Sequence, residues 1–192
     1  SKLPLDEVVR RRPRDPDDVQ ARYNEGVVTL PSGVVRVENS HLPNGNPADS
    51  EKYPYKLSWM DRLKVRVEEL LTLEEPFVVA GDYNVIPTSE DVYDPKAWLN
   101  DALFLPKTRA RFQSLLNLGL TDAFRACHDE PHQFTFWDYQ AGAWNRNNGI
   151  RIDHLLLSPQ AADLLIDCQI DKEVRGGHKP SDHVPVWIDL AA

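Results

Sequence analysis

The chain has 192 residues, of which 41% are hydrophobic and 27% charged, and this composition excludes intrinsically disordered, collagen-like and coiled-coil proteins. Its 22 basic and 30 acidic side chains give a net charge of −8, which argues against binding to nucleic acid through a general positive field. Its two cysteines lack the spacing of a zinc site, and no apolar run reaches the ~18 residues of a membrane span, so we expect a cytoplasmic protein without a membrane partner.

The first half of the chain predicts a hairpin, a helix and a buried strand. β-Branched runs at 26–30 and 33–37, separated by a Pro-Ser pair, predict the hairpin. Apolar residues at three- and four-residue spacing from Lys56 to Leu73 predict a helix that covers one face of a sheet. The apolar run 77–80 predicts a buried strand that ends at polar residues.

The second half predicts further helices and strands in alternation. They are a helix over 109–118, a strand over 151–157, a short helix that begins at Pro159 and carries Leu164, Leu165 and Ile166, and a last strand over 184–190. Strand pairs mixed with separate helices, with no repeat and no linker, predict one domain over 1–192 of the α/β class, in an α+β or layered arrangement.

The segment 101–151 is the only net-positive part of the chain, with six basic and five acidic side chains. Eight aromatic residues lie among its basic side chains, a mixture that suits base stacking together with phosphate contact. Core aromatics beside solvated charges would explain the same composition, so both interpretations stay open.

Polar side chains follow three of the expected strands. Asp82 and Asn84 are two residues apart and would share one face, where a carboxylate can activate water and an amide can donate to a phosphate oxygen. Asp182 and His183 are adjacent, so a turn would direct one to a metal and the other to substrate. Asp153 lies in an apolar strand, where a histidine ring nitrogen is its natural partner. Simple turns would also explain the first two pairs.

Five segments, taken in order, closely resemble the exonuclease III family of the endonuclease/exonuclease/phosphatase superfamily. They are 77–84 (FVVAGDYN), 120–125 (LTDAFR), 134–138 (FTFWD), 149–153 (GIRID) and 181–183 (SDH). The resemblance implies a four-layer αββα sandwich, dependence on magnesium or manganese, incision 5′ to abasic sites and 3′-to-5′ exonuclease activity. It also implies that the partner is duplex DNA with abasic sites or 3′ ends.

The family domain begins with strands that supply an Asn and a Glu to the metal site, and this chain starts downstream of them. We therefore expect an N-terminally incomplete domain with weakened magnesium binding. The complete protein would be a monomer, whereas this chain would expose a sheet edge at which a partner can associate.

The resemblance also implies roles for single residues. Asp82 would orient and activate the attacking water, while Asn84 and His183 would contact the scissile phosphate. Asp153 would hold His183, and Asp182 would bind the metal, with Asp82 and Asn84 as further ligands.

Other residues are implied to contact substrate. His41 stands where the family has a tyrosine, and we count it among the catalytic residues because an imidazole can still donate a hydrogen bond. Asn44 matches a phosphate-contacting asparagine. The expected DNA-binding set also includes three residues of the wall that receives an extruded abasic sugar (Phe136, Ile150 and Ile152) and three neighbours (Trp137, Trp144 and Arg151).

The leading hypothesis is a magnesium-dependent DNA-repair nuclease. One alternative is a phosphoesterase of the same superfamily with a substrate other than DNA, such as an inositol phosphate or a lipid. The other is a catalytically impaired fragment that binds DNA or a partner chain.

Overall fold

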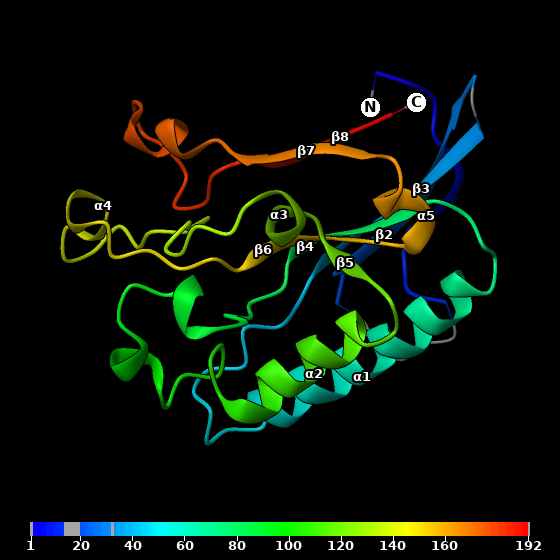
Figure 1. Cartoon of the computed structure of the whole chain (residues 1–192). Coiled ribbons are helices and arrows are strands. Elements are labelled where there is room, and N and C mark those ends of the chain that lie inside the picture. The colour runs from blue at the N-terminus through cyan, green and yellow to red at the C-terminus, as the bar shows by residue number, and fades with distance from the viewer. Residues whose placement is uncertain (1, 14–19, 32, 192) are drawn as a thin grey trace.

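The computed structural model describes residues 2–13, 20–31 and 33–191 of the chain. Its main sheet has six strands in the spatial order β1-β2-β3-β4-β6-β5 (Figure 1). These strands are β1 (Asp6–Val9), β2 (Tyr23–Leu30), β3 (Gly33–His41), β4 (Phe77–Asp82), β5 (Thr121–Asp122) and β6 (Asp153–Leu157). A second sheet pairs β7 (Leu165–Ile170) with β8 (Val186–Leu190).

Strands β2 and β3 form the predicted hairpin, and both extend beyond the runs at 26–30 and 33–37. Ion pairs cover the inner face of this hairpin. The carboxylate of Glu25 is 2.9 Å from a guanidinium nitrogen of Arg36 and 2.8 Å from one of Arg66, and all three side chains are largely buried. Paired charges of this kind let a polar strand pack against a helix without an unsatisfied buried charge.

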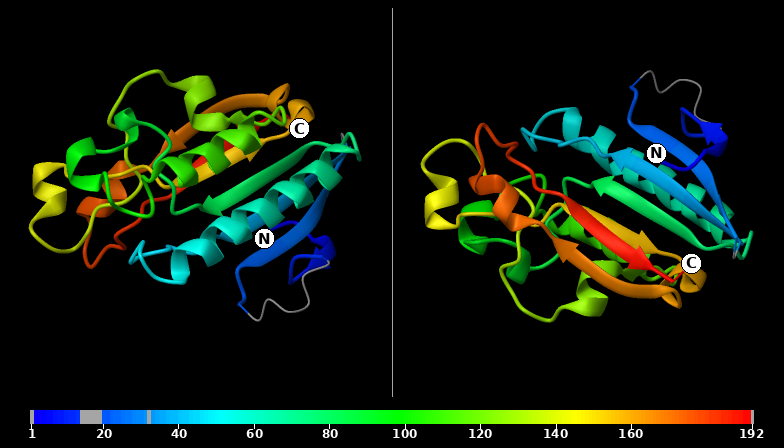
Figure 2. Two further views of the ribbon diagram at one scale, coloured as in Figure 1. Left: turned by 90° about the horizontal axis from the view of Figure 1, so that it is seen from below. Right: turned by 90° about the horizontal axis from the view of Figure 1, so that it is seen from above.

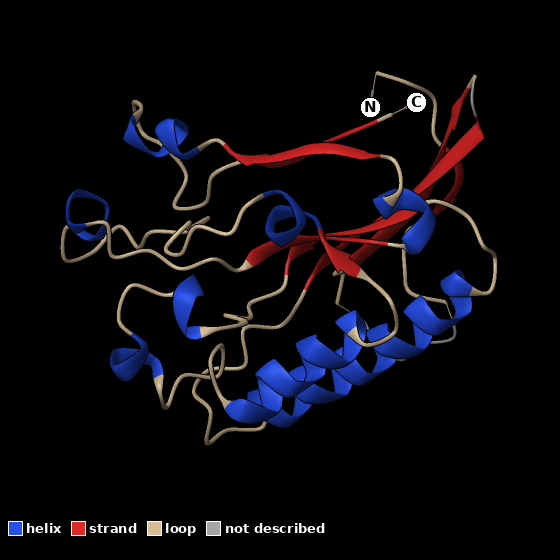
Figure 3. Ribbon diagram, viewed as in Figure 1, coloured by secondary structure: helices blue, strands red, loops and turns tan. Residues whose placement is uncertain are grey.

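Two long helices cover one face of the main sheet. Figure 3 shows α1 (Lys52–Leu71) and α2 (Pro106–Leu116) lying side by side below the strands. Both confirm the helices predicted from apolar spacing, although α1 begins four residues earlier than expected. Their apolar faces and the facing strands share one hydrophobic core, which includes Trp59, Leu63, Val67, Phe77 and Leu156.

The two-stranded sheet lies on the opposite face of the main sheet. β7 packs against the short helix α3 (Ala123–Cys127), and β8 packs against β6. A second core lies between these layers and contains Val78, Phe124, Leu157 and Cys168. Figure 1 shows the resulting order of a helical layer, the main sheet and the small sheet. The predicted α/β class is therefore confirmed.

One boundary near the C-terminal end was predicted wrongly. Ser158 caps α5 (Pro159–Ala162), as expected, because its hydroxyl accepts from the backbone N–H of Ala161. The helix then ends, and Leu165 and Ile166 belong to β7 instead of the helix. Pairing of Leu165 with Leu190 of β8 decides their conformation, which is a long-range effect that local spacing does not reveal.

Short helices occupy the loops beyond the strand ends. They are η1 (Ser89–Asp91), η2 (Pro95–Trp98), α4 (Ala143–Arg146) and η3 (Lys172–Gly176). Among the described residues, no helix combines the length and the apolar character that crossing a membrane requires.

Candidate active site

Strand register brings three of the predicted site residues together. β3 and β4 run parallel and align His41 with Asp82, while β6 runs antiparallel to β4 and aligns Asp153 with Asp82. The end of β3, the end of β4 and the start of β6 thus meet at one edge of the main sheet. Side chains held by neighbouring strands are fixed more rigidly than side chains on free loops.

His183 joins this edge from the segment before β8. An isolated bridge to Phe136 holds its backbone, and its Nδ1 lies 2.9 Å from Oδ2 and 3.1 Å from Oδ1 of Asp153. Burial alone would lower the pKa of His183, but the hydrogen bond and the charge of Asp153 outweigh it and raise that pKa above its ordinary value. The expected pairing of Asp153 with a histidine nitrogen is confirmed.

Asp82 and Asn84 are joined by a tight turn after β4. The backbone N–H of Asn84 donates to Oδ1 of Asp82 at 2.8 Å, and Asn84 has φ of 49°. This is the Asx turn that simple turn chemistry predicts. The turn is compatible with a catalytic role for Asp82, because it fixes the Asp82 carboxylate next to Asp153 and His183.

Burial and, to a smaller extent, the negative charge of Asp153 raise the pKa of Asp82 to about 6. The hydrogen bond from Asn84 and the positive charges of His183 and Lys56 act in the opposite direction. A carboxylate with a pKa close to neutrality can accept a proton from water. Asp82 is therefore the residue in this group best suited to act as a general base.

The side chain of Asn84 is buried and fully engaged. Its Nδ2 donates to the carbonyl of Leu42 at 2.9 Å and to Oδ2 of Asp82 at 3.1 Å, and its Oδ1 accepts from Nδ2 of Asn44 at 3.0 Å. An amide nitrogen has two hydrogens, and Asn84 uses both in this way. These bonds let Asn84 orient Asp82 and Asn44, and the contact of Asn84 with the phosphate stays a prediction. Asn44 is an exposed residue, and its bond to Asn84 uses one of the two hydrogens of its amide.

His41 lies beside Asp82, with Nε2 at 3.4 Å from Oδ2 of that carboxylate. Burial lowers the pKa of His41, and the positive charges of Arg22 and His183 lower it further, so its ring is neutral at pH 7. With 64% of its side chain exposed, His41 borders the site from the solvent side.

Lys56 was missed as a functional candidate. Its ammonium group is fully buried and donates to the backbone carbonyls of Asn44, at 2.9 Å, and of Asn84. Burial lowers the pKa of Lys56 to about 7, although Asp82 and Asp101 act against that shift. The signal was present in the sequence, because Lys56 is in phase with Met60 and the other buried residues of α1.

Three residues of the expected sugar-binding wall lie together. Phe136 pairs with Ile150 and with His183 through isolated bridges, and its ring centroid is 5.0 Å from that of His183. Ile150 and Ile152 are 2% and 3% exposed and pack with Phe104 in a core cluster. Phe136 is only partly buried and is thus the member of the wall that borders the catalytic group.

Trp137 and Trp144 stand edge to face, with ring centroids 5.1 Å apart. Trp137 is completely buried, and its indole nitrogen donates to Asn147 at 3.2 Å. A ring without exposed surface cannot stack on a base, so the predicted DNA contact of Trp137 is contradicted. The half-buried Trp144 remains a prediction.

Arg151 is buried in an ion-pair cluster. Its guanidinium donates to Asp91 at 2.7 Å and to Asp122 at 2.9 Å, and it lies 3.1 Å from Nδ1 of His154. Only 2% of Arg151 is exposed, so the predicted contact with DNA is contradicted as well. The cluster ties the loop before β6 to η1 and to β5.

We expect the change Arg151→Met to lower the free energy of unfolding by about 3 kcal/mol, because it leaves the charges of Asp91 and Asp122 buried without their partner. Urea denaturation would measure this loss. The matched change Arg111→Met breaks an ion pair with Asp61 on the exposed surface and should cost less than about 1 kcal/mol. Equal losses for the two variants would contradict a structural role for the buried cluster.

The described residues contain no large cluster of metal-binding side chains. They contain no group of three or more His, Cys, Asp or Glu side chains that could hold a metal ion. The amide of Asn84 is hydrogen-bonded to Leu42 and Asp82, and the carboxylate of Asp182 accepts from the hydroxyl of Ser181 at 3.4 Å. Magnesium is usually held by one or two carboxylates and completes its octahedral shell with water, so the ligand set of Asp182, Asp82 and Asn84 stays a prediction.

Comparison with known proteins gives consistent matches. A family model described as "Endonuclease/Exonuclease/phosphatase family" matches residues 1–183. Exodeoxyribonuclease III of Haemophilus influenzae is 32% identical over 192 residues, which cover 95% of this chain and 72% of that protein. An exodeoxyribonuclease of Bacillus subtilis is 34% identical over 172 residues, which cover 88% of this chain and 66% of that protein.

Solved structures match nearly the whole of this chain as well. The 3′ phosphatase NExo from Neisseria, bound to a product DNA hairpin, superposes with a TM-score of 0.92 and 36% identity, over 99% of this chain and 72% of that chain. An AP endonuclease from Archaeoglobus fulgidus gives a TM-score of 0.91 and 32% identity, over 100% of this chain and 73% of that chain. The fold described above is therefore shared along nearly its whole length.

Proposed function

Since this chain belongs to the endonuclease/exonuclease/phosphatase family, as its five segments indicated, we propose that it is a magnesium-dependent nuclease of DNA repair. It would cleave phosphodiester bonds 5′ to abasic sites, remove nucleotides 3′ to 5′ from duplex DNA, or do both. One observation carries the proposal, namely the hydrogen-bonded pair of Asp153 and His183 beside Asp82 at the strand ends.

Hydrolysis of a phosphodiester needs an activated water and neutralised phosphate oxygens. Asp82 would accept a proton from the water, whose oxygen attacks phosphorus while the bond to the sugar oxygen breaks. The sugar oxygen leaves with that electron pair and takes a proton from solvent. A doubly protonated His183 would donate from Nδ1 to Asp153 and from Nε2 to a nonbridging phosphate oxygen. Asn44 would donate to the same phosphate from its exposed amide. His41 would border the site beside Asp82.

Similarity to nucleases of DNA supports DNA as the substrate. The Neisseria protein is described with a product DNA hairpin, and other relatives are named exodeoxyribonucleases and AP endonucleases. In this chain the partly buried rings of Phe136 and Trp144 would lie against the DNA, while Ile150 and Ile152 support Phe136 from the core. Members of the family depend on a divalent metal, and we propose Mg²⁺ or Mn²⁺ as the cofactor here. No step above depends on how this chain holds it.

A substrate panel tests the proposal. The chain would be incubated with a duplex containing one abasic-site analogue, a duplex with a recessed 3′ end and a duplex with a 3′-phosphate, each with Mg²⁺ or with chelator. Cleavage that needs metal and is absent from a His183→Ala variant is expected. Hydrolysis of an inositol phosphate without cleavage of any duplex would favour the non-DNA phosphoesterase instead.

A catalytically impaired chain that binds DNA or a partner remains the second candidate. The engaged amide of Asn84 favours it. Binding of the abasic duplex with equal affinity in Mg²⁺ and in chelator, without incision, would support this candidate. We propose in either case that residues 1–192 act as one domain in the cytoplasm.

A further inference from the structure

His183 lies in a loop, so contacts outside the regular strands must hold its backbone. Figure 2 shows the chain between η3 and β8 as this loop. The loop is bonded to the chain that precedes α4. The N–H of Val184 donates to the carbonyl of Thr135 at 2.9 Å, and the N–H of Trp137 donates to the carbonyl of Asp182 at 2.9 Å. These bonds fix the backbone on either side of His183.

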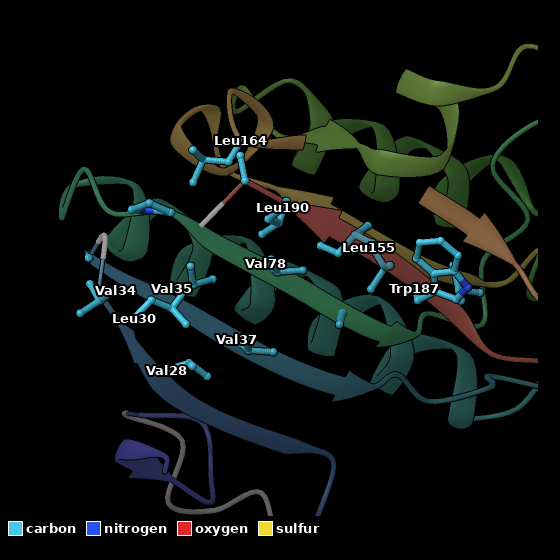
Figure 4. Close-up of a pocket in the computed structure, with 16 residues that line it drawn as sticks. Val28, Leu30, Val34, Val35, Val37, Val78, Leu155, Leu164, Trp187 and Leu190 are labelled. Carbon is cyan, nitrogen blue, oxygen red and sulfur yellow. The ribbon is translucent and has the colours of Figure 1, made fainter. Parts of the chain in front are cut away.

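Asp153 approaches His183 from the start of β6. Alternate residues of a strand point to the same face, so the Asp153 carboxylate lies on the same side of the main sheet as Leu155. Figure 4 shows that Leu155 and Trp187 of β8 line one pocket between the two sheets. Two segments that are distant in sequence must therefore be placed to within a hydrogen-bond length before the pair of Asp153 and His183 can form.

Thr135 is hydrogen-bonded to both of these segments. Its hydroxyl oxygen accepts from the backbone N–H of Ile152 at 3.1 Å and from that of Asp153 at 3.2 Å. Its carbonyl accepts from the N–H of Val184. Thr135 is thus one hydrogen bond away from the backbone of Asp153 and one hydrogen bond away from the residue that follows His183.

The side chain of Thr135 is well suited to hold a fixed position. It is 0% exposed, and its β-branched Cβ restricts rotation about χ1. A hydroxyl oxygen has two acceptor lone pairs, which match the two N–H donors. Bulk water does not reach this position, so removal of the hydroxyl would leave both N–H groups without this acceptor.

A buried hydroxyl of this kind also occurs where it serves the fold alone. Ser158, directly after the far end of β6, is 0% exposed and accepts from the N–H of Phe77 at 3.0 Å and from that of Ala161 at 3.2 Å. These bonds join β4 and α5, away from the catalytic group. Thr135 differs from Ser158 in what its bonds reach, since they lead to Asp153 and to the loop of His183.

We propose that Thr135 is a positioning residue that sets the distance between the carboxylate of Asp153 and the imidazole of His183. It acts through the backbone of the two segments and does not touch the substrate. The effect on cleavage rests on the proposed function, whereas the effect on the geometry of the pair does not. Because the hydroxyl carries this role, serine should replace threonine and valine should not.

Kinetics of incision test the effect on cleavage. The change Thr135→Val keeps the shape of the side chain and removes its hydroxyl, so kcat on the abasic-site duplex in Mg²⁺ should fall by about tenfold or more. KM should change by less than about threefold, because Thr135 does not contact DNA. Thr135→Ser should retain kcat to within about threefold, since it keeps the acceptor. The matched change Ser158→Ala should leave both constants unchanged.

A spectrum of the histidine rings tests the geometry without cleavage. Long-range ¹H–¹⁵N correlation spectra, recorded at one pH, report the ¹⁵N shift of each ring nitrogen, and a His183→Ala variant identifies the signals of His183. The Nδ1 shift should move in Thr135→Val, because the hydrogen bond to Asp153 weakens, and should stay in Thr135→Ser and Ser158→Ala. If the unmodified chain cleaves no duplex, the proposed function fails, and this spectrum still decides the role of Thr135.

Circular dichroism melting separates positioning from stability. Thr135→Val and Ser158→Ala should lower Tm by similar amounts, about 2–8 °C, because each leaves two N–H groups without their acceptor. A folded Thr135→Val variant with an unchanged kcat or an unchanged Nδ1 shift would overturn the proposal. An equal loss of kcat in Thr135→Ser would overturn it as well, because packing would then be the cause. If Thr135→Val does not fold, Thr135→Cys, with a weaker acceptor, replaces it under the same criteria.

Discussion

Replacement of His183 by alanine is expected to lower kcat for incision of an abasic-site duplex by about 10³-fold, because the phosphate loses the charged donor that Asp153 holds in place in the transition state. Single-turnover kinetics at saturating enzyme would measure the chemical step directly. DNA affinity should change little, since the lost contact strengthens as charge develops on the phosphate. A His132→Asn variant, at an exposed histidine away from the site, should keep full activity.

The pH dependence of incision is a second test of the role of His183. The rate should rise with pH through about 6, where Asp82 loses its proton, and fall above the raised pKa of His183. The change Asp153→Asn removes the charge that holds His183 protonated, so the falling limb should move to lower pH. It also removes a negative charge near Asp82, so the rising limb should move to lower pH as well. A profile that does not move would contradict these assignments.

The fold was largely predictable because its elements carry strong local patterns. The three- and four-residue spacing in α1 and the apolar run in β4 each appear where expected. The start of β7 was not predictable, because Leu165 and Ile166 adopt a strand only through pairing with β8. Local spacing contains no information about a partner more than twenty residues away.

Site residues were predictable where the sequence contained a polar group that could not be buried without a hydrogen-bond partner. A carboxylate inside an apolar strand requires a partner, and Asp153 has one in His183. The charge of Arg151 is equally visible, but its partner Asp91 is distant in sequence, so a buried ion pair could not be distinguished from a phosphate contact. The sequence shows that a charged residue is present but does not show which residue of opposite charge lies beside it in the fold.

Lys56 shows how a residue far from the reacting atoms can position them. It is the buried cation between two loops, with hydrogen bonds to the backbone of Asn44 after β3 and of Asn84 after β4. Asn84 in turn fixes Asp82 through its backbone N–H and its amide. Loss of the ammonium group would therefore loosen both loops at once.

We expect Lys56→Met to reduce kcat for incision by about 10²-fold, since a shift near 1 Å in positioned groups has an effect of that size. The positive charge of Lys56 also lowers the pKa of Asp82, so its removal should move the rising limb of the pH profile to higher pH. A residue that only stabilised the fold would not move this limb. Lys52→Met, at an exposed position on the first turn of the same helix, provides the matched control and should leave both kcat and the limb unchanged.

The direction in which the rising limb moves distinguishes the effect of Lys56 on Asp82 from that of Asp153. Removal of a positive charge near Asp82 raises its pKa, whereas removal of the negative charge at Asp153 lowers it. The two variants should therefore displace the rising limb in opposite directions from the unmodified chain. Displacement in the same direction would mean that the charge around Asp82 does not control its proton, and that Lys56 acts on incision only through the packing of the two loops.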